Sequence, residues 1–267
     1  MNKSSSDGEA MAASPKHVDR LLNGKVAVVT GGAAERGIGR AIAVLFAAHG
    51  AKLGIVDIDG KKAEQLAAQL GTEHIGVGCD ITSESDCTKA VAAIATKLGP
   101  VDILVNNAGI GFRRAFLDIT MEEYDRVMNV NMRGTFLMTR AVMPSMVERK
   151  KGNIIFVSST AEQRGGGVYG SSHYAASKAA MSGFARAIAR EFAPTGIRSN
   201  VIAPNLIRTD ITIGMSDEER ARIEQGVPLQ RSGTPEDVAG AALFLASDLS
   251  AYTTGAAIDV NGGFHIR

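Results

Sequence analysis

The sequence of 267 residues contains little cysteine and no long apolar run. Its only cysteines are Cys79 and Cys87. Their spacing matches neither a zinc finger nor a disulfide-rich scaffold, so we expect two reduced packing residues of a cytoplasmic protein and no metal site. No window holds the roughly 18 consecutive apolar residues that a membrane-spanning helix requires. A disulfide-stabilised domain and an integral membrane protein are both disfavoured.

The sequence also lacks an excess of charge of either sign. Its 29 Lys and Arg residues and 28 Asp and Glu residues give a formal net charge of +1. No dense basic run is present, and such a run would be the footprint of nucleic acid or of an anionic membrane surface. We therefore expect a small molecule as the partner, with no binding of nucleic acid or membrane.

The first 23 residues differ in composition from the rest of the chain. They are rich in small and polar residues and lack the apolar segment of a secretory signal. We expect a flexible tail over residues 1–23, followed by a single domain over residues 24–267, because this length fits one large α/β domain better than two small ones.

From Lys25 onward, short apolar runs alternate with longer segments of helical period. This alternation is typical of βαβ units and predicts an α/β fold with a parallel sheet. We expect strands at 26–30, 52–57, 74–80, 101–105, 153–157, 198–203 and 257–260, and helices at 40–48, 60–70, 83–98, 120–148, 174–192, 216–225 and 234–246.

A glycine-rich turn over residues 31–39 connects the first strand with the first helix. In this arrangement backbone N–H groups and a helix N-terminus bind a pyrophosphate, and glycine is needed because a Cβ would obstruct the phosphates or the turn. An ordinary glycine-rich loop is the alternative, and the flanking strand and helix disfavour it. The expected contacts are Gly31, Arg36, Gly37, Ile38 and Gly39.

An acid, Asp57, ends the second strand. A carboxylate in this position accepts hydrogen bonds from the adenosine ribose hydroxyls and repels a 2′-phosphate, which favours NAD over NADP. Arg36 is the competing signal, since it could neutralise a 2′-phosphate from the glycine-rich turn. We give the acid more weight, because a buried carboxylate facing a phosphate is electrostatically costly.

Two further polar residues are candidates for the site, one after an expected strand and one inside an expected helix. Asp80 follows the third strand, where it could contact the adenine or simply form a turn. Asn131 falls in the middle of a helical segment over residues 120–148 that is either one long helix or a broken one. Asparagine is a poor helix former, so its side chain is expected to satisfy a buried polar group or a water.

Tyr174 and Lys178 are four positions apart and share a helix face. An ammonium close to a phenol lowers its pKa and yields a general acid/base usable near neutral pH. A surface lysine over a half-buried tyrosine is the alternative. Ser159 follows the fifth strand and could hold a carbonyl or alcohol oxygen beside the phenol. No catalytic histidine or G-x-S-x-G elbow accompanies it, which disfavours nucleophilic hydrolysis.

Taken together and in this order, the glycine-rich turn, the Asn106–Gly109 segment, Asn131, Ser159 and the Tyr174/Lys178 pair resemble the short-chain dehydrogenase/reductase family. The resemblance covers about residues 25–263 and is closest to 3-oxoacyl carrier-protein reductases and sugar or polyol dehydrogenases. It implies a doubly wound, Rossmann-like sheet of seven strands with helices on both faces. It also implies a homotetramer.

The resemblance assigns roles to individual residues. Tyr174 would be the general acid/base, Lys178 would lower its pKa and bind the nicotinamide ribose, and Ser159 would orient the substrate oxygen. Asn131 would hold a water of a proton relay. The remaining cofactor contacts would be Asp80, Ile81, Asn107, Ala108, Gly109, Pro204 and Thr209.

Three features depart from the family pattern. The glycine-rich turn is two residues longer than the usual TGxxxGxG, so either Gly31 or Gly32 could be its first glycine. The interval from Ser159 to Tyr174 is about two residues longer, in the loop over residues 165–170. Asn205 replaces the glycine that usually follows the proline. None of the three removes a catalytic residue.

The sequence thus predicts an NAD-dependent oxidoreductase that interconverts a secondary alcohol and a ketone. We expect a small polar substrate, such as a sugar, polyol or hydroxy acid, from Arg113, Gln163, Arg164 and Asn205, although Arg113 could equally be solvated surface charge. The alternative enzyme is an NADPH-dependent 3-oxoacyl thioester reductase. A non-catalytic dinucleotide-binding protein would be expected to lack the tyrosine or the lysine.

Overall fold

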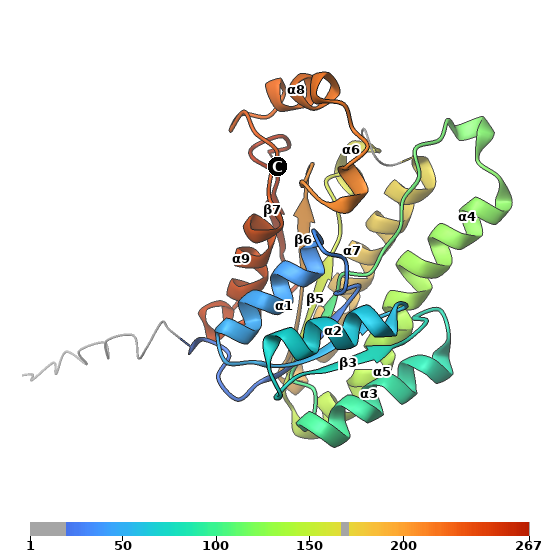
Figure 1. The fold of residues 1–267 in the computed structure, drawn as a ribbon. Coiled ribbons are helices and arrows are strands. Elements are labelled where there is room, and N and C mark those ends of the chain that lie inside the picture. Colours follow the sequence, from blue (N-terminus) through green and yellow to red (C-terminus); the bar gives the residue numbers. More distant parts are fainter. Residues whose placement is uncertain (1–19, 167–170, 267) are drawn as a thin grey trace, which may run out of the picture.

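A parallel sheet of seven strands forms the centre of the protein (Figure 1). The computed structural model describes residues 20–166 and 171–266. The strand order is β3-β2-β1-β4-β5-β6-β7 and every neighbouring pair is parallel, which confirms the doubly wound fold. The strands are β1 (Val26–Thr30), β2 (Lys52–Asp57), β3 (Ile75–Gly78), β4 (Ile103–Asn106), β5 (Gly152–Val157), β6 (Ile197–Pro204) and β7 (Ala257–Val260).

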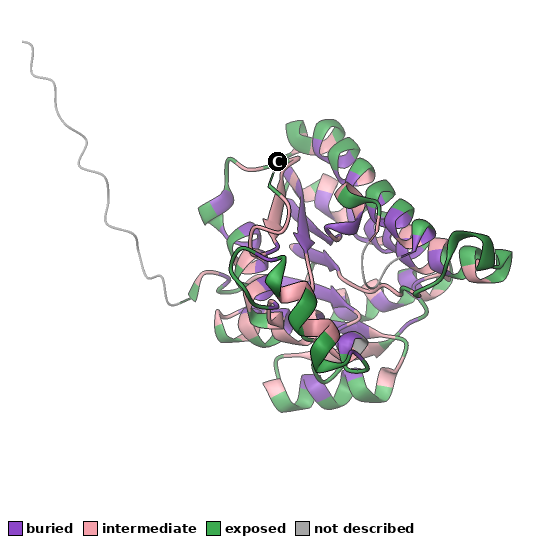
Figure 2. Cartoon of the chain, turned by 90° about the horizontal axis from the view of Figure 1, so that it is seen from above, coloured by how far each residue is buried: buried purple, intermediate pink, exposed green. Residues whose placement is uncertain are grey.

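Helices cover both faces of this sheet. The helices α1 (Ile38–Ala48), α2 (Gly60–Leu70) and α9 (Pro235–Ala246) pack on one face. The helices α3 (Glu84–Leu98), α5 (Thr135–Arg149) and α7 (Ser172–Phe192) pack on the other. Figure 2 shows the buried strands between helices whose outer surfaces are exposed. Burial on both faces explains why the central strands are apolar throughout instead of alternating.

The folded domain begins slightly earlier than expected. Leu22 is fully buried in the core beside α1 and donates a backbone hydrogen bond to His49. Residues 20–23 therefore belong to the domain, because removing Leu22 would expose apolar surface. The rest of the expected tail, residues 1–19, lies outside the described residues.

The segment predicted as one long or broken helix is broken by a π-helical turn. Helix α4 (Met121–Met128) leads into the π-helix η3 (Asn129–Gly134), which continues directly into α5. Thr120 caps α4 by accepting a hydrogen bond from the N–H of Glu123. Asn131 lies inside the π turn, a widening of the helix that is common at functional sites.

The direction of chain crossing reverses between β1 and β4, which are neighbours in the sheet. In an open parallel sheet the carboxyl ends of the strands at such a point form a crevice. The short helices α6 (Ala161–Arg164) and α8 (Asp217–Gln225) lie at this end of the sheet (Figure 1). Within the described residues, no helix combines the length and apolar character needed to cross a membrane. The 3₁₀ turns are η2 (Phe116–Asp118), η4 (Ala193–Thr195), η5 (Asp210–Thr212) and η6 (Asp248–Ser250).

Candidate functional site

A cleft of about 1420 Å³ opens at the carboxyl ends of the strands. It brings together most of the residues predicted from the sequence, although they come from the ends of β1 to β6 and from α7. The predicted residues that line it are Gly31, Gly37, Ile38, Asp57, Asp80, Ile81, Asn107, Ala108, Gly109, Ser159, Arg164, Tyr174, Lys178, Pro204, Asn205 and Thr209. Five predicted residues do not line it: Arg36, Gly39, Arg113, Asn131 and Gln163.

The glycine-rich turn forms one end of the cleft. Gly31 has a φ of +64°, and a Cβ there would lie 2.8 Å from the Cα of Ala108. A Cβ on Gly39 would lie 2.5 Å from the carbonyl oxygen of Gly31. Gly32 instead faces Ile55 in the core, so Gly31 is the first motif glycine. The free N–H groups at the start of α1 complete a cradle that fits a pyrophosphate.

The carboxylate of Asp57 is fixed in place by the backbone. One oxygen accepts a hydrogen bond of 3.0 Å from the N–H of Ala33, and the other accepts one of 3.1 Å from the N–H of Asp59. Each oxygen keeps a further lone pair for a ligand in the cleft. This arrangement fits the ribose hydroxyls of a dinucleotide and opposes an additional phosphate.

Sequence reasoning missed Thr30, which positions the neighbouring wall of the cleft. The hydroxyl of this buried residue accepts hydrogen bonds from the N–H groups of Asn107 and Ala108, both at 3.0 Å. The side chain of Asn107 returns the contact by donating to the carbonyl oxygens of Thr30 and Gly31, at 2.9 and 3.0 Å. The sequence signal for this network is that Thr30 is the one polar residue of an otherwise apolar strand.

Asp80 forms the turn that was one of its two expected roles. Its carboxylate accepts hydrogen bonds from the N–H and the hydroxyl of Thr82, at 2.9 and 2.8 Å, as a turn-forming aspartate does. The residue also lines the cleft beside Ile81. Asp80 therefore shapes the adenosine end of the cleft while remaining accessible to a ligand.

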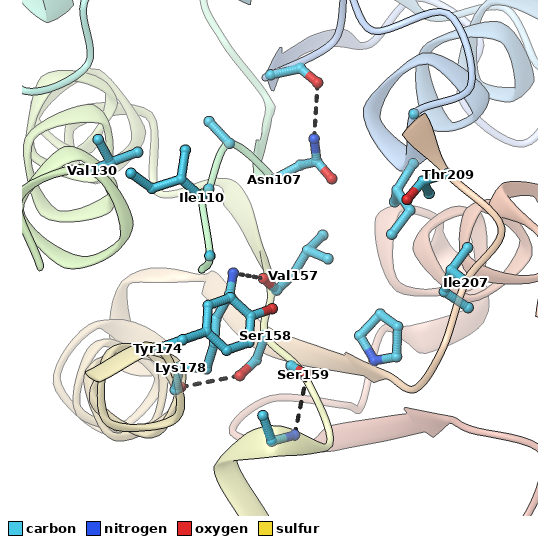
Figure 3. A pocket seen from close by; sticks show the side chains of 18 of the residues that line it. Asn107, Ile110, Val130, Val157, Ser158, Ser159, Tyr174, Lys178, Ile207 and Thr209 are labelled. Carbon is cyan, nitrogen blue, oxygen red and sulfur yellow. Dashed lines mark hydrogen bonds between the residues drawn. The ribbon is translucent and has the colours of Figure 1, made fainter. Parts of the chain in front are cut away.

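Tyr174 and Lys178 meet Ser159 at the other end of the cleft (Figure 3). The ammonium of Lys178 donates a hydrogen bond of 2.9 Å to the carbonyl oxygen of Val157 and lies 5.7 Å from the centre of the Tyr174 ring. Ser159 hydrogen-bonds Tyr174. A Cβ on Gly111 would lie 2.9 Å from the ring of Tyr174, so the loop approaches the phenol closely because this residue has no side chain.

The pKa of Tyr174 moves opposite to the sequence expectation. Burial raises the pKa of the phenol, and the hydrogen bond with Ser159 opposes this shift. Burial also lowers the pKa of Lys178 to about 8, against the attraction of the Glu162 carboxylate. The loss of hydration in the cleft wall outweighs the effect of one nearby charge. The phenol is thus protonated at neutral pH in the protein alone.

Asn131 holds a loop instead of pointing into the cleft. Its side-chain oxygen accepts a hydrogen bond of 2.8 Å from the N–H of Ile110, and its amide donates to the carbonyl oxygen of Ile110 and the hydroxyl of Ser177, both at 2.9 Å. These contacts occupy the fully buried side chain. In this structure the side chain therefore fixes the backbone beside Gly109.

Two of the four residues expected to contact substrate do not line the cleft. Arg113 forms an ion pair of 2.8 Å with Glu219 of α8, and Gln163 donates a hydrogen bond of 3.1 Å to Asp259. The partners of both side chains lie on other elements. The spacing of residues in the sequence does not indicate such pairs. Residues 167–170 of the longer loop lie outside the described residues.

The substrate end of the cleft has an apolar lining that the sequence did not reveal. Arg164 and Asn205 do line the cleft. Arg164 lies 4.2 Å from the centre of the Phe264 ring and donates a hydrogen bond of 2.9 Å to the carbonyl oxygen of Phe264. The residues missed in this region are Ile110, Leu206, Ile207, Arg222, Ile223 and Phe264. They come from loops, α8 and the C-terminal segment, which carry no motif.

Comparisons with known proteins agree with this geometry. Residues 31–265 match the family model described as enoyl-(acyl carrier protein) reductase. The chain is 47% identical over 252 residues to a short-chain type dehydrogenase/reductase of Sinorhizobium fredii, covering 92% of this chain and 100% of that protein. It is 40% identical over 245 residues to the 3-oxoacyl-[acyl-carrier-protein] reductase FabG of Escherichia coli, covering 92% and 99%.

The chain belongs to the short-chain dehydrogenase/reductase family. It is similar to the crystal structure of a 3-ketoacyl-(acyl-carrier-protein) reductase from Brucella melitensis complexed with NADH. The TM-score is 0.85 at 38% identity, with 92% of this chain and 100% of that chain covered. The protein is therefore an oxidoreductase with the dinucleotide-binding fold of this family.

The longer glycine-rich turn of this short-chain dehydrogenase/reductase places Arg36 beside Asp210. Its guanidinium and its backbone N–H each donate a hydrogen bond of 3.1 Å to the carboxylate of Asp210 in η5. Arg36 therefore bridges two walls of the cleft mouth. Arg36 was the competing signal for a 2′-phosphate, and in this structure its side chain pairs with the carboxylate of Asp210.

No group of three or more His, Cys, Asp or Glu residues forms a metal-binding arrangement in the part of the chain that the structure describes. The site of this short-chain dehydrogenase/reductase thus consists of a dinucleotide cradle and a phenol with a lysine and a serine beside it.

Proposed function

We propose that the protein is an NAD(H)-dependent oxidoreductase that interconverts a secondary alcohol and a ketone. The observation that carries this proposal is the position of Tyr174 and Asp57 on one continuous cleft. The phenol offers a proton at one end, and the fixed carboxylate selects the cofactor at the other. A bound nicotinamide ring would supply the hydride, which no side chain can provide.

Tyr174, Ser159 and Lys178 have separate roles in proton transfer. In reduction, Tyr174 donates its proton to the carbonyl oxygen, which Ser159 orients by a hydrogen bond. The charge of the Lys178 ammonium stabilises the phenolate that this step leaves behind. In oxidation the phenolate removes the alcohol proton, so the raised pKa of Tyr174 makes oxidation faster as the pH rises.

We assign the two halves of NAD to the two ends of the cleft. The pyrophosphate would lie against Gly31 and the start of α1, with the ribose hydroxyls on Asp57. The nicotinamide half would lie between Lys178 and the segment that contains Pro204 and Thr209. Figure 3 shows Thr209 across the cleft from Tyr174.

The substrate class that the lining favours is a 3-oxoacyl thioester. The lining of the cleft includes Ile110, Leu206 and Ile223, which suit an acyl chain. Arg164 and Arg222 add positive charge to the lining, which suits an acidic carrier or a phosphate-bearing thiol. The names of the Escherichia coli and Brucella melitensis relatives support the same class.

A small polar substrate, such as a sugar, polyol or hydroxy acid, is the second candidate. The amide of Asn205 favours it, because this polar side chain lines the cleft and its oxygen lies 3.3 Å from the hydroxyl of Thr160. Arg113 and Gln163, two of the four residues from which the sequence predicted a polar substrate, do not line the cleft.

Steady-state assays of the purified protein separate these candidates. We expect NADH-dependent reduction of a 3-oxoacyl thioester, such as acetoacetyl-coenzyme A, to exceed NAD-dependent oxidation of any member of a panel of polyols, sugars and hydroxy acids. Preference for a panel member would select the second candidate. Binding of NADH without turnover of any substrate would indicate a non-catalytic dinucleotide-binding protein.

We also propose a cytoplasmic homotetramer. Phe136 on α5 is 42% exposed and its ring lies 5.7 Å from that of Phe184 on α7, so an apolar surface follows these two helices. Cys79 and Cys87 are buried free thiols, which suits a reducing compartment. Light scattering coupled to gel filtration tests the assembly, and a monomeric mass would contradict it.

A further inference from the structure

Glu162 lies behind the catalytic wall and does not line the cleft. It belongs to α6, three positions after Ser159. One oxygen of its carboxylate lies 2.5 Å from the hydroxyl of Ser158 and also accepts a hydrogen bond from the hydroxyl of Ser182. Both serines are buried, so two hydroxyls hold the carboxylate between the end of β5 and α7.

These anchors place the carboxylate beside the turn of α7 that carries Lys178. The hydroxyl of Ser158 lies 3.0 Å from the carbonyl oxygen of Lys178, so its single proton is shared between this oxygen and Glu162. Ser182 follows Lys178 by one helical turn and faces the same side. A negative charge is thus built into the wall that surrounds a buried ammonium.

The other groups around Lys178 carry no negative charge. Tyr174 faces it from its own helix, and the carbonyl oxygen of Val157 faces it from β5. A Cβ on Gly109 would lie 3.3 Å from the ammonium and 3.2 Å from the side-chain oxygen of Asn131, so the loop and the π-helix contribute neutral groups. In the described part of the chain, Glu162 is the carboxylate whose attraction opposes the burial of this ammonium.

We propose that Glu162 is a positioning residue that keeps Lys178 in its ammonium form at neutral pH and holds the strand end that carries Ser159 against α7. This inference rests on the proposed role of the Tyr174 and Lys178 pair. Glu162 touches neither substrate nor cofactor in this arrangement, so it acts only through Lys178 and the position of Ser159.

The pH dependence of reduction carries the signature of this role. Reduction needs both the phenol and the ammonium, so kcat/KM for the ketone falls as the pH rises through the Lys178 pKa of about 8. Removing the negative charge of Glu162 lowers that pKa further, because an opposite charge favours the charged form. The fall in kcat/KM then begins at a lower pH.

The test compares pH profiles of kcat/KM for ketone reduction with NADH in the wild type, Glu162→Gln and Ser182→Ala. The glutamine variant removes the charge but keeps the shape, whereas the serine variant removes an anchor but keeps the charge. We expect the alkaline midpoint of Glu162→Gln to fall by roughly half a pH unit or more. The midpoint of Ser182→Ala should stay at the wild-type value, and Glu162→Asp should restore it.

Equal midpoints in wild type and Glu162→Gln would overturn the inference, because a merely structural residue changes rates without moving the profile. If Glu162→Gln does not fold, Glu162→Ser takes its place. Failure of both neutral variants to fold while Ser182→Ala folds would also reject it, since the carboxylate would then serve stability. An inactive wild type, or an active Tyr174→Phe variant, would instead overturn the proposed function.

Discussion

The two ends of the cleft are built in different ways. The cofactor end consists of strand ends and backbone groups, as at Gly31, Asp57 and Thr30, where each polar side chain is fixed by hydrogen bonds to the main chain. The substrate end consists of loops, α8 and the C-terminal segment, whose side chains contact one another, as Arg164 does with Phe264. Few sequences can form the cofactor end, whereas the residues of the substrate end can vary with the substrate.

Replacing Tyr174 by phenylalanine should have the largest effect and should separate the two ends. Loss of the proton donor is expected to lower kcat by about 10²- to 10⁴-fold, because phenylalanine lacks the hydroxyl that donates this proton. Stopped-flow turnover and NADH fluorescence titration measure the two functions separately, and the affinity for NADH should remain near that of the wild type. Tyr124→Phe on α4 is the matched control and should keep full activity.

Replacing Asp57 by alanine should change the cofactor end alone. We expect the ratio of kcat/KM for NADH over NADPH to fall about tenfold or more, the size of a lost charge-assisted hydrogen bond. Asp59→Ala, which removes the cap of α2 and an exposed ion pair with Lys62, should leave this ratio unchanged. An unaltered ratio in Asp57→Ala would transfer cofactor selection to another residue.

At the substrate end, Phe264→Ala should raise the KM for the ketone by several-fold, roughly the effect of truncating one apolar contact in a partly open site. The affinity for NADH should not change. Arg113→Ala provides the control, because this side chain pairs with Glu219 outside the cleft and its loss should leave KM unaffected. The opposite pattern would restore the original assignment of Arg113 to substrate binding.

The smallest effect is expected from replacing Arg36, which pairs with Asp210 at the mouth of the cleft. The Arg36 and Asp210 pair is exposed, so Arg36→Ala should raise the NADH dissociation constant by no more than about fivefold, less at high salt. Asp210→Ala should behave alike, and the double variant should match either single one. Additive effects in the double variant would show that the two side chains act separately.

The sequence predicted the fold and the cofactor end well, for a physical reason. A buried parallel strand must be apolar, so its end is marked by the first polar residue, and Asp57 and Asp80 lie where that rule places them. The sequence left open whether residues 120–148 form one helix or a broken one, because an apolar helical stripe continues across the π turn at Asn131. Thr30 was missed because its contacts depend on the order of β1 and β4 in the sheet.

The substrate end was predicted poorly, because its side chains are placed by partners far away in the sequence. Arg113 and Gln163 are held by Glu219 and Asp259, which no local pattern connects to them. The pKa of Tyr174 was wrong in direction for a related reason. Spacing on a helix shows that a lysine is near, but only the folded wall shows how far burial outweighs its charge.

One measurement tests most directly that the fixed carboxylate and the phenol form a single NAD-dependent site. It is the ratio of kcat/KM for NADH over NADPH in the wild-type protein, with one ketone substrate at a fixed concentration. The carboxylate of Asp57 predicts a preference for NADH of about tenfold or more. A ratio at or below one would contradict the account.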